Sequence, residues 1–149
     1  METNAFYHEN LKYILEDRKE FISYQKDALS FVNRGSIFKG TLNIVNFFSN
    51  KNLQKGDTII CILEFSEELI HILQACKYMG IIYSCCPIGL GETSLQHRIE
   101  DTCAKLIIDD ISIFDEEFKI NSTSSCQVLY DEFPMFIIYT SGSTGKPKG

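Results

Sequence analysis

The chain has 149 residues, of which 44% are hydrophobic and 23% are charged, and its formal net charge is −6. This length and composition are ordinary for one globular domain with a real core. The negative charge argues against a general nucleic-acid or anionic-membrane binder. The first residues do not resemble a signal peptide, and the apolar runs fall far short of the ~20 residues of a membrane helix, so a cytoplasmic location is expected.

The first fifty residues are predicted to form a helix, a small hairpin and a second helix. Apolar residues recur at helical spacing from Leu11 to Phe21, which predicts a helix near the start. The short apolar pieces "ALSFV" and "SIFKG" lie on either side of a turn-like "NRG" and predict a hairpin. The apolar residues between Thr41 and Asn50 predict a helix that is buried on most sides.

A strand and a well-delimited helix come next. The turn-forming "QKGD" precedes "TIICIL" at 58–63, a strand that is apolar on both faces. Ser66 is a candidate N-cap, and Glu67 and Glu68 follow it in the first turn, where the helix dipole favours acids. Gly80 is expected to end this helix, as glycine commonly does.

The same alternation continues to the end of the chain. "IIYSCC" at 81–86 predicts a strand, "ETSLQHRIEDT" a helix that turns Leu95 and Ile99 inward, and "AKLIID" at 104–109 another strand. A polar loop with a brief turn around "FDEEF" is expected over 110–127, before the strand-like "QVLY" and "MFIIYT". Alternating strands and helices with apolar strands predict an α/β fold, in which helices flank a layered, mostly parallel sheet.

The cysteines and histidines do not form a recognisable metal site. No Cys-x-x-Cys pair is present and no histidine lies at zinc-site spacing from two cysteines, so reduced, structural cysteines are expected. His71 is expected to be partly buried and His97 to lie on the surface, neither with a catalytic role. The first four cysteines are predicted to be small core residues, and the full set is Cys61, Cys76, Cys85, Cys86, Cys103 and Cys126.

The last residues, "TSGSTGKPKG", are suited to hold a polyphosphate. They follow residues 136–139, which are predicted to be a buried strand. Glycines allow consecutive backbone N–H groups to turn toward one concavity, hydroxyls add donors, and lysines add positive charge. The spacing differs from the common nucleotide loop, and a flexible Gly/Ser segment is the plainer alternative. The predicted phosphate ligands are Thr140, Ser141, Gly142, Ser143, Thr144, Gly145, Lys146 and Lys148.

The stretch "YTSGSTGKPKG" resembles the phosphate-binding signature of the AMP-forming adenylate enzymes. That superfamily includes acyl-CoA synthetases, adenylation domains of nonribosomal peptide synthetases, and luciferases. The resemblance extends over residues 37–149, whereas residues 1–36 match only weakly, and it would make the chain the N-terminal part of the large domain. The stretches "HRIEDTCAKLII" and "PMFIIYTSGSTGKPKG" are more similar to acetyl- and propionyl-CoA synthetases than to peptide-synthetase domains.

The resemblance implies a reaction in two steps. A small carboxylic acid attacks the α-phosphate of Mg-ATP to give an acyl-adenylate and pyrophosphate, and the thiol of CoA then releases AMP. The family's other catalytic segments, its Mg²⁺ ligands and its C-terminal domain have no counterpart here, so no catalytic or metal-binding residue is assigned and this chain alone is not expected to turn over. Two alternatives stay open: part of an amino-acid or aryl adenylating domain, and a truncated, non-catalytic relative.

Overall fold

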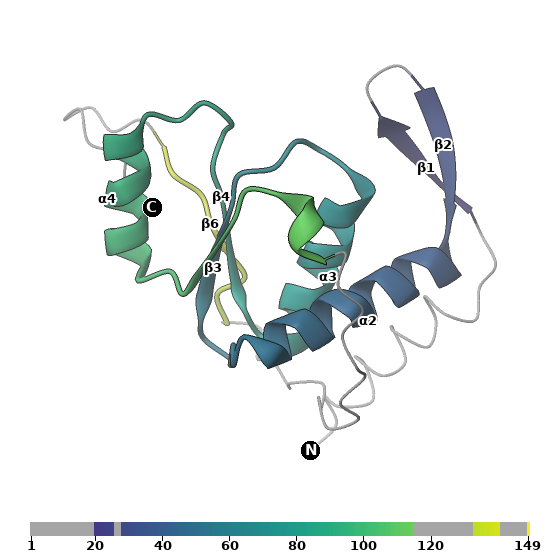
Figure 1. Ribbon diagram of the computed structural model, residues 1–149, viewed down its shortest axis with the longest axis horizontal. Coiled ribbons are helices and arrows are strands. Elements are labelled where there is room, and N and C mark those ends of the chain that lie inside the picture. Colours follow the sequence, from purple (N-terminus) through teal and green to yellow (C-terminus); the bar gives the residue numbers. More distant parts are fainter. Residues whose placement is uncertain (1–19, 26–27, 115–132, 141–148) are drawn as a thin grey trace.

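The computed structural model describes residues 20–25, 28–114, 133–140 and 149 (Figure 1). Two sheets and three helices make up the described part of the chain, together with one short 3-10 helix. In chain order the elements are β1 (Glu20–Gln25), β2 (Ala28–Asn33), α2 (Arg34–Asn50), β3 (Thr58–Cys61), α3 (Glu67–Met79), β4 (Ile82–Cys85), α4 (Glu92–Thr102), β5 (Leu106–Ile108), η1 (Ile111–Phe114) and β6 (Phe136–Ile137).

A hairpin is present, and the predicted strand "ALSFV" forms one side of it as β2, but the other strand is not the predicted one. β1 pairs with β2 in antiparallel register, with Gln25 opposite Ala28, and the two strands project beyond the first turn of α2 (Figure 1). The segment "SIFKG", predicted as the second strand, lies inside α2, and Phe21, predicted as helical, lies in β1. The turn-like "NRG" misled the prediction because Arg34 and Gly35 open a helix here and do not reverse the chain. The rest of the predicted first helix lies outside the described residues.

Four parallel strands in the order β5-β3-β4-β6 form the main sheet, which confirms the predicted α/β class. The register places Ile59 opposite Leu106 on one side and opposite Tyr83 on the other. All four residues of β3 are buried, as its apolar sequence predicted. Because the strands are parallel, their carboxyl ends lie at one edge of the sheet, and any loop that leaves them there meets its neighbours.

Helices cover both faces of this sheet, α2 and α3 on one side and α4 on the other (Figure 1). The main hydrophobic core lies on the side of α2 and α3. There Phe47 makes an edge-on contact with Phe114, with the two ring centres 4.9 Å apart. The α4 side is less apolar than predicted. Leu95 and Ile99 are only half-buried, whereas Arg98 between them is buried, with 8% of its surface exposed.

The ends of α3 follow the predicted signals closely. Ser66 takes an extended backbone conformation, and its hydroxyl accepts a hydrogen bond from the Leu69 N–H at 3.4 Å. Gly80 ends the helix in the left-handed region at φ 71°, where a side chain would be strained. Its carbonyl accepts a hydrogen bond from the Gly56 N–H at 2.8 Å, which ties the turn before β3 to the turn before β4.

Asp57 links the amino ends of β3 and β5. One carboxylate oxygen accepts a hydrogen bond from the Gln54 N–H at 2.7 Å and closes the turn that carries Gly56 at φ 90°. The other oxygen pairs with the Lys105 ammonium at 2.8 Å, just before β5. The predicted turn "QKGD" therefore also stabilises the sheet, because Asp57 bonds both to its own turn and to the residue before the neighbouring strand β5.

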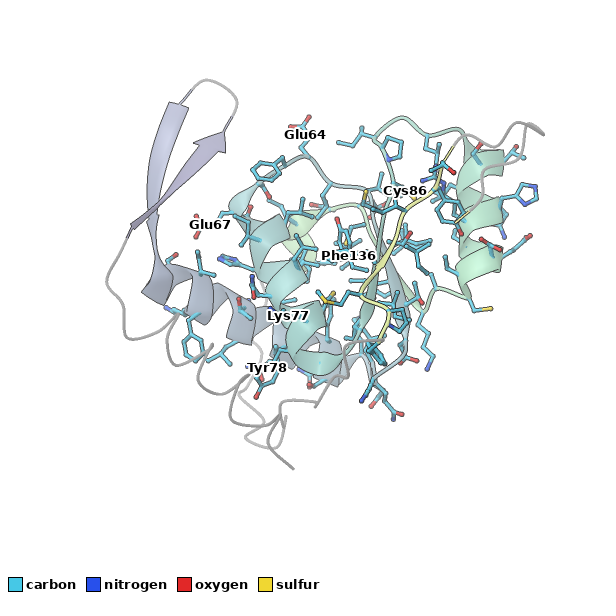
Figure 2. All side chains as sticks on the ribbon, turned by 180° about the vertical axis from the view of Figure 1, so that it is seen from behind. Glu64, Glu67, Lys77, Tyr78, Cys86 and Phe136 are labelled. Atoms are coloured by element: carbon cyan, nitrogen blue, oxygen red, sulfur yellow. The ribbon has the colours of Figure 1, made fainter. Side chains whose placement is uncertain are left out.

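The strand β6 is not buried, contrary to prediction. Phe136 is 50% exposed and Ile138 is 70% exposed. The physical reason is position: within the described residues β6 lies at the edge of the sheet and pairs with β4 alone, so its apolar side chains have neighbours on one side only. Figure 2 shows Phe136 in front of the sheet. The centre of its ring lies 6.0 Å from the centre of the buried Tyr83 ring, in an edge-on contact.

A close contact between Gly40 and His71 sets the approach of α2 to α3. A Cβ at Gly40 would lie 2.2 Å from two atoms of the His71 ring. The ring is buried as predicted, and burial lowers the pKa of His71 below its ordinary value, despite nearby Glu67 and Glu68. The imidazole is therefore neutral at pH 7 and fills the space that glycine leaves open.

We expect Gly40→Ala to destabilise the fold by a net ~1–2 kcal/mol in urea unfolding followed by circular dichroism. Overpacking against a buried ring costs ~1–3 kcal/mol, and the better helix propensity of alanine offsets up to ~1 kcal/mol of that cost. Gly91→Ala is the matched control, because a Cβ there meets nothing within 4 Å, and its loss should stay near ~0.5 kcal/mol. Equal stability of Gly40→Ala and wild type would contradict the contact.

Candidate functional site

Among the predicted phosphate ligands, Thr140 lies in the described part of the chain. It is exposed and follows β6 by three residues, at the carboxyl edge of the parallel sheet. Ligands of open α/β sheets bind outside this edge, so the position suits the prediction. The other predicted ligands lie outside the described residues: Ser141, Gly142, Ser143, Thr144, Gly145, Lys146 and Lys148.

Gly149, the last residue of this motif, lies against the residues that precede the motif. A Cβ at Gly149 would lie 3.0 Å from Tyr139 Cζ and 3.0 Å from Ile137 Cγ2. The end of the chain therefore packs on the strand segment from which the motif departs, beside α4 (Figure 1). Tyr139, just before the motif, and Gly149, at its end, therefore lie at the same place on the sheet edge.

Arg98 of α4 lies under this point. Its guanidinium carbon is 4.7 Å from the centre of the Tyr139 ring, which is a cation–π distance. The same guanidinium donates at 3.5 Å to the carbonyl of Cys85, the last residue of β4, and lies 3.4 Å from the Cys86 sulfur. One buried side chain thus contacts the ends of two neighbouring strands, and Figure 2 shows Cys86 on the side of the sheet where α4 lies.

Tyr139 also contacts α4 through its hydroxyl. The phenol donates a 2.5 Å hydrogen bond to Asp101 Oδ2, one helical turn after Arg98. Loss of solvent, followed by the bond to Asp101 and the charge of that carboxylate, raises the pKa of Tyr139 to about 12. The phenol therefore remains a donor at neutral pH.

Prediction from sequence missed Arg98, Asp101 and Tyr139. Arg98 sits between Leu95 and Ile99 on the inward side of α4, and an arginine on an otherwise apolar helix face is a signal that could have been used. Its spacing of three residues to Asp101 places both side chains on one face. The contact with Tyr139 had no local signal, because 38 residues separate it from Asp101.

The cysteines near the strand ends are unpaired thiols, as predicted. Cys61, Cys76 and Cys86 are buried, and desolvation raises the pKa of Cys61 and of Cys76. Cys85, predicted to be in the core, is exposed at the last position of β4. Cys126 lies outside the described residues.

A hollow of about 380 Å³ lies on the outer face of α4. Two carboxylates line it, so it repels phosphate, and His97 is exposed there as predicted. Within the ranges that the structure describes, no cluster of three or more potential metal ligands occurs. No helix in those ranges is long and apolar enough to cross a membrane. The residues that line the hollow are Glu92, Thr93, Gln96, His97 and Glu100.

We expect the thiols to react in two classes. In the folded protein, N-ethylmaleimide should modify the exposed Cys85 and Cys103 within minutes, while the buried Cys61 and Cys76 should react at least ~100-fold more slowly, because a thiolate is the nucleophile and burial disfavours it. Peptide mass mapping over time measures each site. The same reaction in urea is the control, and rapid modification of Cys61 without urea would show that the sheet is wrongly described.

The comparisons with known proteins agree with this fold. The pattern of the family described as "AMP-binding enzyme" matches residues 41–149. Acetyl-coenzyme A synthetase of Thiobacillus denitrificans is 29% identical over 196 aligned positions, which cover 94% of this chain and 30% of that protein. The PKS-NRPS hybrid synthetase acdB of Aspergillus candidus is also 29% identical, over 134 positions that cover 74% of this chain and 5% of that protein.

Two solved structures show the same fold at low identity. The N-terminal subdomain of Klebsiella oxytoca NpsA, in complex with 3-hydroxyanthranilyl-AMSN, has a TM-score of 0.78 at 21% identity and covers 93% of this chain and 38% of that one. The fatty acyl-adenylate ligase of L. pneumophila, in complex with acyl adenylate and pyrophosphate, has a TM-score of 0.72 at 18% identity and covers 94% and 28%. The chain thus spans about a third of the length of such relatives. With the family pattern matching well over half of its residues, the chain belongs to the AMP-binding enzymes.

Proposed function

We propose that this chain is the N-terminal part of an ATP-dependent, AMP-forming acyl-CoA synthetase, which makes an acyl-adenylate from a small carboxylic acid and then a thioester with CoA. One observation carries the proposal: "TSGSTGKPKG" begins three residues after β6 ends, at the carboxyl edge of a parallel sheet. The identity with acetyl-coenzyme A synthetases supports acetate or another short acid as the substrate class.

The motif residues would bind the β- and γ-phosphates of ATP. Backbone N–H groups around Gly142 and Gly145 and the hydroxyls would donate to phosphate oxygens, and Lys146 and Lys148 would add charge. These donors would stabilise the negative charge that grows on pyrophosphate as it leaves. The carboxylate is already a nucleophile, so this half-reaction needs no general base. The hydroxyl donors are Thr140, Ser141, Ser143 and Thr144.

The donor set of the motif fits phosphate better than a divalent cation. Mg²⁺ prefers oxygen ligands, and carboxylates in particular, whereas the motif has no carboxylate and offers N–H groups, ammonium groups and hydroxyls, of which only the hydroxyls could coordinate the ion. When bound, the ion would neutralise part of the charge of ATP through the phosphate oxygens. CoA is a substrate in this proposal, and no residue of the chain is assigned to it.

The match to acdB supports a second candidate function within the same family. Its identity of 29% equals that of the acetyl-coenzyme A synthetase of Thiobacillus denitrificans, so an amino-acid or aryl adenylating domain is the alternative. The two classes differ in the acid that they activate and in the acceptor thiol. A non-catalytic relative is the third reading, and it predicts phosphate binding without turnover at any chain length.

We expect Lys146→Ala to weaken pyrophosphate binding by the 149-residue chain ~10–100-fold, because a charge-assisted hydrogen bond to phosphate is lost. Gly142→Ala should weaken it ~10-fold by blocking close approach. Titration calorimetry measures the affinities, and the backbone amide shifts of Gly142 and Gly145 locate the ligand by NMR. Lys39→Ala, an exposed lysine of α2, is the charge control. Wild-type affinity in both motif variants would refute the assignment.

Turnover is tested on the native protein from its source, whose intact mass gives its length. We expect ATP–pyrophosphate exchange that depends on acetate or propionate. Exchange with amino or aryl acids alone would favour the alternative class. A full-length protein that binds pyrophosphate but exchanges with no acid would support the non-catalytic reading.

A further inference from the structure

Tyr139 is the meeting point of three contacts that the proposed function does not use. The Arg98 guanidinium lies 4.7 Å from the centre of its ring, its hydroxyl donates to Asp101, and Gly149 packs against its ring carbons. Two of these contacts come from α4 and the third from the last residue of the motif. All three converge on the last aromatic residue before the motif begins.

Arg98 is a buried cation with few hydrogen-bond and ionic partners. It is buried, and in the described part of the chain its guanidinium has no carboxylate partner and its Nε has no hydrogen-bond acceptor. Its recorded contacts are the Cys85 carbonyl, the Cys86 sulfur and the Tyr139 ring. Burial of a cation without a paired anion costs free energy of folding. The position of Arg98 against the Tyr139 ring therefore indicates a function for this residue.

We propose that Arg98, Asp101 and Tyr139 form a clasp that positions the phosphate-binding motif, with Arg98 as its central positioning residue. This inference rests on the proposed function, because it concerns the same motif. Arg98 fixes the ring plane of Tyr139 and ties it to the end of β4, while Asp101 fixes the other end of the ring. The fixed ring in turn offers a surface on which Gly149 packs.

The physical effect is preorganisation. Eight residues separate Thr140 from Gly149, and a phosphate ligand must find all of their donors in one arrangement. Bringing the two ends of a segment together costs entropy, and a protein that holds them together before the ligand arrives removes that cost from binding. The clasp holds both ends on one ring, so its loss should weaken phosphate binding without removing any phosphate ligand.

The clasp is also insensitive to pH in the physiological range. The Tyr139 phenol keeps its proton, because desolvation and Asp101 raise its pKa to about 12. We therefore expect the fold-loss of pyrophosphate affinity in Arg98→Met to be the same at pH 6.5 and pH 8.5.

The test uses substitutions of Arg98 in the 149-residue chain. Arg98→Met keeps the length of the buried side chain and removes the guanidinium, and Arg98→Lys keeps the charge and loses the flat stacking group. Two controls are matched to them. Gln96→Ala changes the exposed face of α4, where Gln96 bonds to Glu100, and Gly40→Ala lowers stability at a site far from the clasp.

The first measurement needs no ligand. In wild type we expect nuclear Overhauser contacts between the Tyr139 ring protons and the Gly149 α-protons. They should vanish in Arg98→Met and persist in both controls. Their persistence in Arg98→Met overturns the clasp, whether or not the chain binds phosphate, so this result is independent of the proposed function.

The second measurement is pyrophosphate affinity by calorimetry. We expect a ~5–20-fold loss in Arg98→Met, a partial recovery in Arg98→Lys, and wild-type affinity in the two controls. An equal loss in Arg98→Met and Gly40→Ala would show a stability effect alone and would overturn the positioning role. Wild type that binds no pyrophosphate would instead refute the phosphate assignment and with it the clasp's purpose.

Discussion

Burial of β3 on both faces is the constraint on which the rest of the structure depends. Its four residues have neighbours on both edges and helices above and below, so each side chain removes apolar surface from water. Such a strand cannot stand at an edge, and β4 and β5 must pair with it. The position of α4 follows, because the face opposite the main core also needs cover, and the carboxyl edge where Tyr139 lies is then bounded by α4.

The elements between Asp57 and Ile108 were predictable because their signals are local. Ser66 and Gly80 mark the ends of α3 by backbone chemistry alone, and the apolar run of β3 is typical of a central parallel strand. One strand of the hairpin was predicted correctly and the other was placed after the turn-like "NRG" and not before "ALSFV", because Gly35 is compatible with both a turn and a helix start. Its real strands are fixed by pairing between β1 and β2, which no local signal gives.

The chemistry of the candidate site could be predicted from the sequence, but the residues that pack around it could not. The composition of the motif indicates phosphate binding, because glycines, hydroxyls and lysines in one short run are suited to bind phosphate. Arg98, by contrast, shares the apolar face of its predicted helix with Leu95 and Ile99, but only the packing of α4 in the folded protein shows that it contacts Tyr139. The expected burial of Phe136 and Ile138 failed for a related reason. Apolar composition indicates a strand, but the neighbours of that strand decide its exposure.

The strand β6 has a consequence for the order in which the protein assembles. Tyr83 and Phe136 are paired across more than fifty residues of chain, a longer stretch than separates the paired residues of β3 and β4 or of β3 and β5. Pairings between distant segments form late in folding, because a long loop must close first. A two-residue edge strand is also the kind of element that opens first in a native protein. The motif is therefore attached to the part of the sheet that is completed last and released first, which makes its local stability adjustable with little effect on the core.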